Sequence, residues 1–124
     1  MSQDIVADAL NQIMNAKKAG RNSVTVNRHS KLLLKVLEVA KKEGYIDSFE
    51  TKQTNLRIDF TKINFCKAIK PRFNVKIEGI DKYIRRYLPS RNFGVIIIST
   101  SQGLMVHQKA YEKNLGGSLI AYFY

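Results

Sequence analysis

The chain has 124 residues, of which 44% are hydrophobic and 25% charged, so it can form one packed core but is short for two independent domains. Its 21 Lys and Arg against 10 Asp and Glu residues give a net charge of +11, which favours a polyanionic partner such as nucleic acid, although a basic surface that only aids solubility is an alternative. The single cysteine excludes an intrachain disulfide and a multi-cysteine metal site, and it fits a reducing compartment.

Neither the N-terminus nor any apolar run indicates export or membrane insertion. The first four residues are polar and acidic, unlike a signal peptide. The longest aliphatic run, at 95–98, is far too short to span a bilayer. We therefore expect a soluble, intracellular protein.

The first half of the chain predicts the order helix, strand, helix, strand, strand. Apolar residues recur at helical spacing in two segments, and Gly20 and Gly44 are stop signals after them. A polar turn at 51–55 separates the last two strands. The predicted elements are helices at 5–14 and 30–43 and strands at 23–27, 45–49 and 56–60.

From Cys66 the chain becomes more basic. Between positions 66 and 91, eight Lys and Arg residues oppose two acidic residues, which leaves a net charge of +6. Tyr83 and Tyr87 interleave with this basic patch, a mixture suited to phosphate contact and to stacking on bases or riboses. The alternative role for these aromatic residues is packing between the lobes, and this is the role that we expect for Phe73. The patch comprises Lys67, Lys70, Arg72, Lys76, Lys82, Arg85, Arg86 and Arg91.

The C-terminal part predicts mostly antiparallel β structure with one short helix. The elements are a buried strand at 93–100, a turn at 101–103, a returning strand to 106, a helix at 107–115 and a last strand at 119–124. We therefore predict an α+β fold of two small packed lobes, an N-terminal α-β-α-β-β lobe at 1–65 and a C-terminal lobe at 66–124.

No arrangement of residues indicates catalysis. His29 and His107 fall in different lobes, without Cys or acidic partners at ligand spacing. We expect His107 to begin a helix, His29 to lie beside a phosphate or in solvent, and Cys66 to be a small buried side chain. The serines at 99–101 lack the glycine spacing of a nucleophile elbow, and no glycine-rich phosphate loop is present. We predict no enzyme, no cofactor and no metal site.

The segment Ser99-Thr100-Ser101-Gln102-Gly103 offers uncharged hydrogen-bonding groups at a hairpin tip. Hydroxyls and an amide can pair with the ribose hydroxyls that line the shallow minor groove of A-form RNA, and a glycine lets the backbone approach closely. An ordinary turn also favours serine and glycine, so composition leaves both interpretations open.

Motifs along nearly the whole chain are similar to those of one family, the universal small-subunit ribosomal protein eight. The matching residues are Asp4 to Ala16 (with Asp8, Leu10, Ile13 and Asn15), Ser30-Lys31-Leu32, Glu43-Gly44-Tyr45-Ile46, Ser99 to Met105, Ala110, and Gly116-Gly117 with Leu119-Ile120-Ala121-Tyr122. The segments 68–73 and 87–94 and His107 resemble the archaeal and eukaryotic branch. Ser118 stands where bacterial members carry a glutamate, so no role of that carboxylate is carried over.

The resemblance implies a structural constituent of the small ribosomal subunit, located in the cytoplasm. It implies primary binding to the central domain of small-subunit ribosomal RNA and contacts with neighbouring ribosomal proteins, with no membrane and no small-molecule substrate. The alternative from another class is a free-standing regulator that binds messenger RNA.

The resemblance also implies which residues contact RNA. The C-terminal RNA-binding lobe would use Ser99, Thr100, Ser101, Gln102, Gly103, Gly116 and Gly117. The N-terminal lobe would touch a second RNA segment through Asn15, Ser30 and Lys31, where a helix N-terminus can face a phosphate. Arg72, Tyr87 and Arg91 are further candidates because of the composition of the basic patch.

Overall fold

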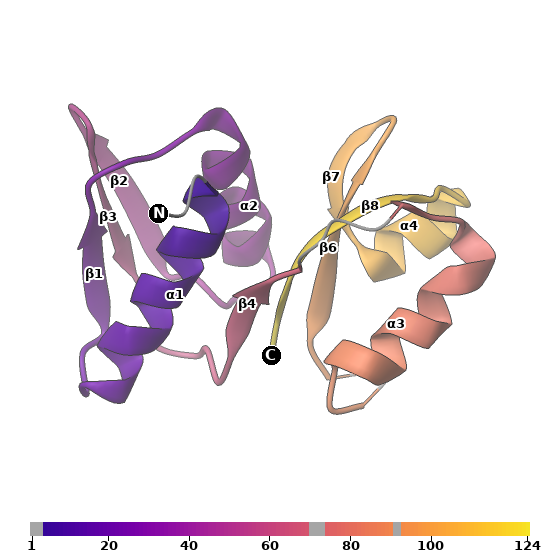
Figure 1. Cartoon of the computed structure of the whole chain (residues 1–124), viewed down its shortest axis with the longest axis horizontal. Helices are drawn as coiled ribbons and strands as arrows, with labels where there is room; N and C mark the ends of the chain where they lie inside the picture. The colour runs from indigo at the N-terminus through magenta and orange to yellow at the C-terminus, as the bar shows by residue number, and fades with distance from the viewer. Residues whose placement is uncertain (1–3, 70–73, 91–92) are drawn as a thin grey trace. The chain divides into compact units, whose positions relative to one another are not determined.

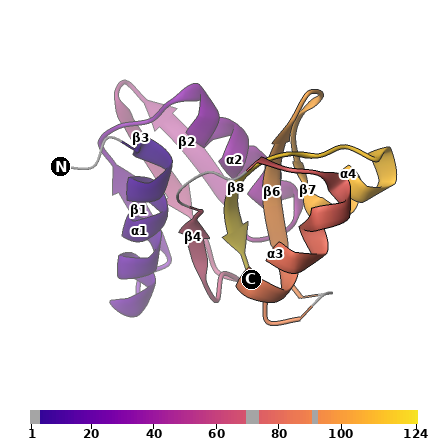
Figure 2. The ribbon, with the colours of Figure 1, turned by 45° about the vertical axis from the view of Figure 1, so that its right-hand side comes forward.

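The structure is a computed structural model that describes residues 4–69, 74–90 and 93–124. The chain divides into two compact units, Met1–Lys67 (unit 1) and Ala68–Tyr124 (unit 2), each described below by itself (Figures 1 and 2). None of the helices in the described ranges is long and apolar enough to cross a membrane.

Unit 1 has the predicted order of elements. These are α1 (Ile5–Lys18), β1 (Ser23–Val26), α2 (Lys31–Lys42), β2 (Ser48–Lys52) and β3 (Asn55–Asp59). The strands form an antiparallel sheet in the order β1-β3-β2, and both helices lie on one side of it (Figure 1). Its fully buried apolar side chains include Leu10, Ile13, Leu33, Val36, Leu37, Leu56 and Ile58.

The ends of both helices in unit 1 follow from local side-chain chemistry. The Asp4 carboxylate accepts a hydrogen bond from the Ala7 N–H at 3.1 Å, and the Ser30 hydroxyl accepts one from the Leu33 N–H at 3.1 Å. Each satisfies a backbone donor that the first turn leaves without a helical partner. After α2, Gly44 has φ of +88°, a conformation that glycine adopts without steric cost.

The fourth element differs from the prediction. β2 covers Ser48–Lys52 rather than 45–49, and only Phe49 in it is half-buried, the other residues being exposed. An edge strand with one partly buried side chain has no alternation of apolar and polar residues, so its register could not be predicted. Its position is set by the turn to β3, where Lys52 pairs with Asn55 and Gln53 has φ of +58°.

The remaining elements build the second sheet and the helices that cover it. They are β4 (Cys66–Ala68), β5 (Asn74–Val75), the 3-10 helix η1 (Ile77–Gly79), α3 (Ile80–Tyr87), β6 (Val95–Thr100), β7 (Gly103–Val106), α4 (His107–Lys113) and β8 (Gly117–Phe123). The sheet order is β4-β8-β6-β7, and β5 also pairs with β8. In unit 2, α3 and α4 lie on the same side of the sheet, and the β6–β7 hairpin extends past them (Figure 1).

The α+β class is confirmed, but unit 2 contains two α-helices where the prediction had one short helix. The additional helix, α3, buries Ile80, Ile84 and the following Leu88, which recur at every fourth residue and form one apolar stripe. The charged and tyrosine side chains between them made the segment look like a basic patch rather than a helix.

The central strand β6 anchors the hairpin that carries the predicted RNA-binding loop. All four residues from Val95 to Ile98 are buried, and β8 pairs with this strand on one side and β7 on the other. The pairing with β7 ends at Ile97 and Val106, and beyond it the N–H of Ile96 donates to Nδ1 of His107 at 3.1 Å. Burial lowers the pKa of His107 to about 4, so the ring is neutral and can accept this bond. His107 begins α4, as predicted.

Candidate nucleic-acid interface

At the tip of the β6–β7 hairpin, one side chain forms hydrogen bonds within the turn and two others are exposed to solvent. The Thr100 hydroxyl donates to the Gly103 carbonyl at 2.8 Å and accepts from the Gln102 N–H at 3.1 Å, so this hydroxyl stabilises the turn itself. Gly103, with φ of +109°, supplies a backbone conformation that other residues rarely adopt. The side chains of Ser101 and Gln102 are exposed and are the groups at the tip that a ligand can reach.

Two glycines at the start of β8, Gly116 just before the strand and Gly117 as its first residue, allow three strands to approach closely. A Cβ atom on Gly117 would lie less than 3.0 Å from the carbonyl oxygen of Ser99, and one on Gly116 would lie less than 3.0 Å from the carbonyl oxygen of Val75. Any side chain at either position would therefore push β8 away from β6 or β5. The glycine pair brings the start of β8 beside Ser99, which lies close to the tip of the hairpin.

The register then aligns polar side chains across the sheet. Ser118 pairs directly with Ser99 on β6 and with Asn74 on β5, so the three side chains project from the same face. We call the surface formed by 99–103 and 116–118 the hairpin end. It contains only Ser, Thr, Gln, Gly and no ionisable side chain, so its groups can press against RNA edges without desolvating a charge.

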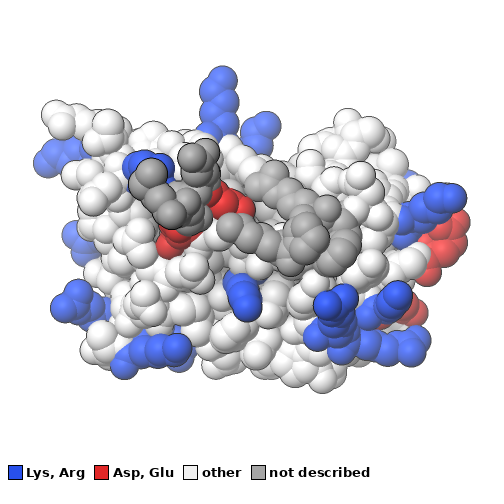
Figure 3. Space-filling view, in the orientation of Figure 1, with Lys and Arg blue, Asp and Glu red and all other residues white. Residues whose placement is uncertain are grey.

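The described part of the basic patch concentrates on α3. Lys82, Arg85 and Arg86 are exposed, and Lys and Arg side chains gather over this helix in the space-filling view (Figure 3). In the described chain none of the three forms an ion pair within 4.0 Å. This helix can therefore hold phosphates by charge.

Tyr87 lies within a group of aromatic rings. Its ring centroid is 5.0 Å from that of Tyr122 and 6.4 Å from that of Tyr83, the latter ring stacked at 13°. The guanidinium carbon of Arg86 lies 5.6 Å from the Tyr87 centroid, within the range of a cation–π interaction. Packing is thus an observed role of Tyr87, and contact with RNA stays a prediction.

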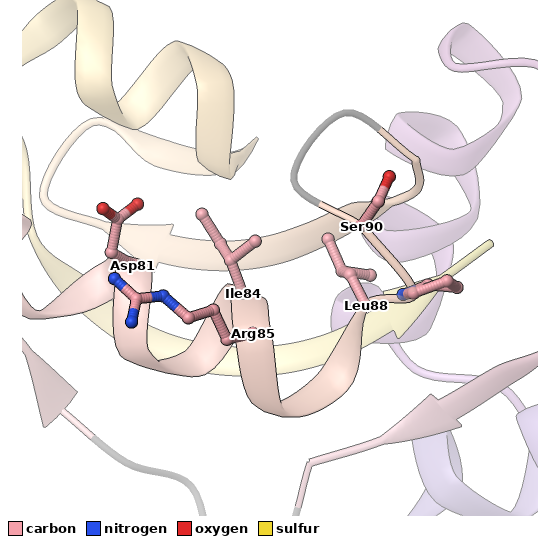
Figure 4. Close-up of a pocket in the computed structure, with 6 residues that line it drawn as sticks. Asp81, Ile84, Arg85, Leu88 and Ser90 are labelled. Carbon is pink, nitrogen blue, oxygen red and sulfur yellow. The ribbon is translucent and has the colours of Figure 1, made fainter.

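A pocket of about 220 Å³ opens beside α3. Figure 4 shows Ile84 and Leu88 pointing the same way from the helix, with Arg85 extending toward Asp81 and Ser90 on the loop beyond. Asp81 accepts a hydrogen bond from the Tyr111 hydroxyl at 3.0 Å. The described residues that line the pocket include Ser90 but no histidine, so this lining does not supply the serine–histidine pair that acyl transfer uses.

The candidates in unit 1 lie on two helices. Asn15 is exposed on α1, and Lys31 is exposed at the first position of α2, next to the Ser30 hydroxyl that caps the helix. Their exposure is compatible with RNA contact, which stays a prediction.

Two interactions near these residues were not foreseen. Arg28 forms an ion pair with Asp8 at 3.0 Å, and Nε2 of His29 donates to the Gln53 carbonyl at 3.3 Å. His29 is half-buried, where the sequence had suggested a phosphate or solvent beside it. Both interactions join residues 20 or more positions apart, so periodicity could not reveal them.

Three residues singled out from the sequence, Arg72, Phe73 and Arg91, lie outside the described residues. The prediction that Arg72 and Arg91 contact RNA and that Phe73 packs between lobes therefore rests on the sequence alone.

Comparison with known proteins places the chain among ribosomal proteins. A family model described as ribosomal protein S8 matches residues 4–124. The small ribosomal subunit protein uS8A of Schizosaccharomyces pombe is 42% identical and is aligned over 98% of each chain. The uS8 protein of Nanoarchaeum equitans is 40% identical over 100% of each chain, and that of Eremothecium gossypii is 39% identical over 97% of this chain and 96% of its own. These archaeal and eukaryotic relatives agree with the branch that the motifs indicated.

Proposed function

Because this chain belongs to the ribosomal protein S8 family, we propose that it binds the central domain of small-subunit ribosomal RNA and supports assembly of that subunit. It is a structural, RNA-binding constituent of the cytoplasmic small ribosomal subunit, associated there with ribosomal RNA and other ribosomal proteins, and it is not an enzyme. No observation on the described residues favours a messenger-RNA regulator as the alternative.

The observation that carries the proposal is the hairpin end. Ser101 and Gln102 are exposed at the tip, and Gly117 brings the start of β8 against Ser99. Exposed uncharged donors beside a close backbone approach suit the ribose hydroxyls and base edges of a shallow RNA groove. In this proposal the hairpin end reads the RNA.

The remaining candidates serve affinity and orientation. Lys82, Arg85 and Arg86 on α3 would contact phosphates, which position RNA without selecting its sequence. In unit 1, Asn15, Ser30 and Lys31 would contact a second RNA segment. The first unit would thus add contact area, and the second would supply selectivity.

The test is a binding titration with separate transcripts of the 5′, central and 3′ domains of the source organism's small-subunit ribosomal RNA. We expect the central-domain transcript to bind at least tenfold more tightly than the other two, because specific sites exceed non-specific phosphate contact by such factors. Equal affinity for all three transcripts would contradict the proposed function.

A further inference from the structure

β5 has only two residues, yet its place in the sheet is tightly defined. Asn74 and Val75 pair with Ser118 and Gly117 of β8. A Cβ atom on Gly116 would approach not only the Val75 carbonyl but also Cα of Lys76, at 3.0 Å. This close packing fixes the backbone that carries Asn74, so its side chain projects from a defined point beside the hairpin end.

The orientation of the Asn74 side chain is also set by β8. The Ser118 hydroxyl donates a hydrogen bond to Oδ1 of Asn74, across a strand pair whose members are 44 positions apart in the chain. With the amide oxygen facing Ser118, the amide nitrogen faces away from it and carries two N–H donors. Asn74 is exposed, so these donors are accessible to a ligand.

The surroundings of this amide suit an oxygen acceptor of RNA. Ser118 continues the row from Asn74 to Ser99, close to the tip of the hairpin, and these three side chains are neutral. Lys76 is exposed and has extended backbone dihedrals of −82° and 159°, so its side chain projects from the same face as that of Asn74. Fixed amide donors next to one ammonium group match a base carbonyl, a ribose oxygen or a phosphate oxygen.

We propose that Asn74, oriented by Ser118, is a further RNA-contact residue that donates hydrogen bonds to an oxygen acceptor of the bound RNA. The assignment rests on the proposed function and extends the binding surface from the hairpin end onto β5. Ser118 acts through Asn74 as a positioning residue. In this arrangement Ser118, the residue after the paired glycines, contributes to RNA binding although it carries no carboxylate.

The test compares Asn74→Asp with wild type in titrations against the central-domain transcript and an unrelated RNA of equal length. The aspartate keeps an acceptor for the Ser118 hydroxyl but replaces both N–H donors with a charged oxygen, so we expect affinity to fall about tenfold. The matched control is Asn55→Asp, the same change at an exposed residue of β3 in unit 1, for which we expect less than about a twofold loss. Circular dichroism spectra that match wild type show that the sheet is intact.

A second variant, Asn74→Ala, removes the donors without adding charge. We expect about a threefold loss of affinity and an unchanged salt dependence. A loss confined to the central-domain transcript identifies a base edge as the acceptor, and an equal loss for both RNAs identifies a ribose or phosphate oxygen. If Asn74→Asp binds like Asn55→Asp while the central-domain transcript is still selected, the Asn74 assignment is wrong and the proposed function stands. If wild type selects no transcript, both are overturned.

Discussion

The hairpin end and the exposed side of α3 belong to the same unit but differ in their surface chemistry. The hairpin end combines exposed Ser101 and Gln102 with a close backbone approach at Gly117, and it carries no charge. The exposed side of α3 presents Arg85 and Arg86 with solvent around them. In the proposed function, the exposed cations of α3 position the RNA by charge, whereas selectivity depends on the neutral groups of the hairpin end, which are held by tight packing.

The largest expected effect is a loss of stability at Gly117, where the hairpin end depends on close packing of β8 against β6. Gly117→Val would force a side chain into the Ser99 carbonyl, and we expect it to lower the free energy of unfolding by about 3 kcal/mol, measured by urea denaturation. The control is Gly79→Ala, because a Cβ at Gly79 meets nothing within 4 Å and should change stability by less than about 0.5 kcal/mol. Similar losses in the two variants would break the argument that the glycine pair is needed for strand approach.

The stability of the scaffold that carries the hairpin should also depend on pH, through His107. Burial lowers the pKa of His107 from 6.5 to about 4, so between these values the unfolded chain binds more protons than the folded one. Stability should therefore be complete above pH 6.5 and fall as the pH drops toward 4, by an amount on the order of 3 kcal/mol. His107→Asn keeps an acceptor for the Ile96 N–H but does not titrate, so urea denaturation at pH 7 and 4.5 should show a smaller pH effect. An equal effect in both proteins would rule out His107 as the cause.

A smaller effect is expected at the hairpin tip. Ser101→Leu removes an exposed hydroxyl and adds bulk without touching the turn bonds of Thr100. We expect a loss of about 1–3 kcal/mol in binding free energy for the central-domain transcript, with unfolding unchanged. Thr51→Leu on the exposed edge strand β2 is the control for added apolar surface. Unchanged affinity for Ser101→Leu would mean that the segment is only a turn.

The smallest effect in selective binding is expected from α3. Replacing Arg85 and Arg86 with Glu should flatten the plot of log affinity against log salt concentration by about one to two units, because about two phosphate contacts are lost. Lys17→Glu with Lys18→Glu, at exposed positions on α1, makes the same change in net charge elsewhere. If both double variants change the slope equally, only total charge matters and α3 has no local role.

The predictable parts of the fold are those with local signals. Ser30 and Gly44 marked the ends of α2, because a cap and a positive φ act within a few residues. The unbroken aliphatic run of β6 predicted a buried strand correctly. By contrast, α3 has eight residues, too few for a strong periodic signal among its charges, and the edge strand β2 has no buried face.

Within the candidate site, the sequence predicted residue types better than their partners. The serine and threonine loop and the glycine pair were visible as motifs. The bond between Asn74 and Ser118 joins positions 44 residues apart, and the use of the Thr100 hydroxyl in the turn depends on the hairpin register. The first pairing arises from tertiary structure, which no spacing within one segment can specify, and the second depends on the conformation of the turn, which residue types alone do not fix.

The central claim is that the hairpin end selects the RNA and that α3 only positions it. The most direct test is the ratio of affinities for the central-domain transcript and an unrelated RNA of equal length. Measured at one salt concentration for wild type, Ser101→Leu and the Arg85→Glu, Arg86→Glu variant, the ratio should fall about tenfold in Ser101→Leu. In the arginine variant both affinities should fall together and leave the ratio within about twofold of wild type. A ratio that falls in the arginine variant and holds in Ser101→Leu would contradict the account.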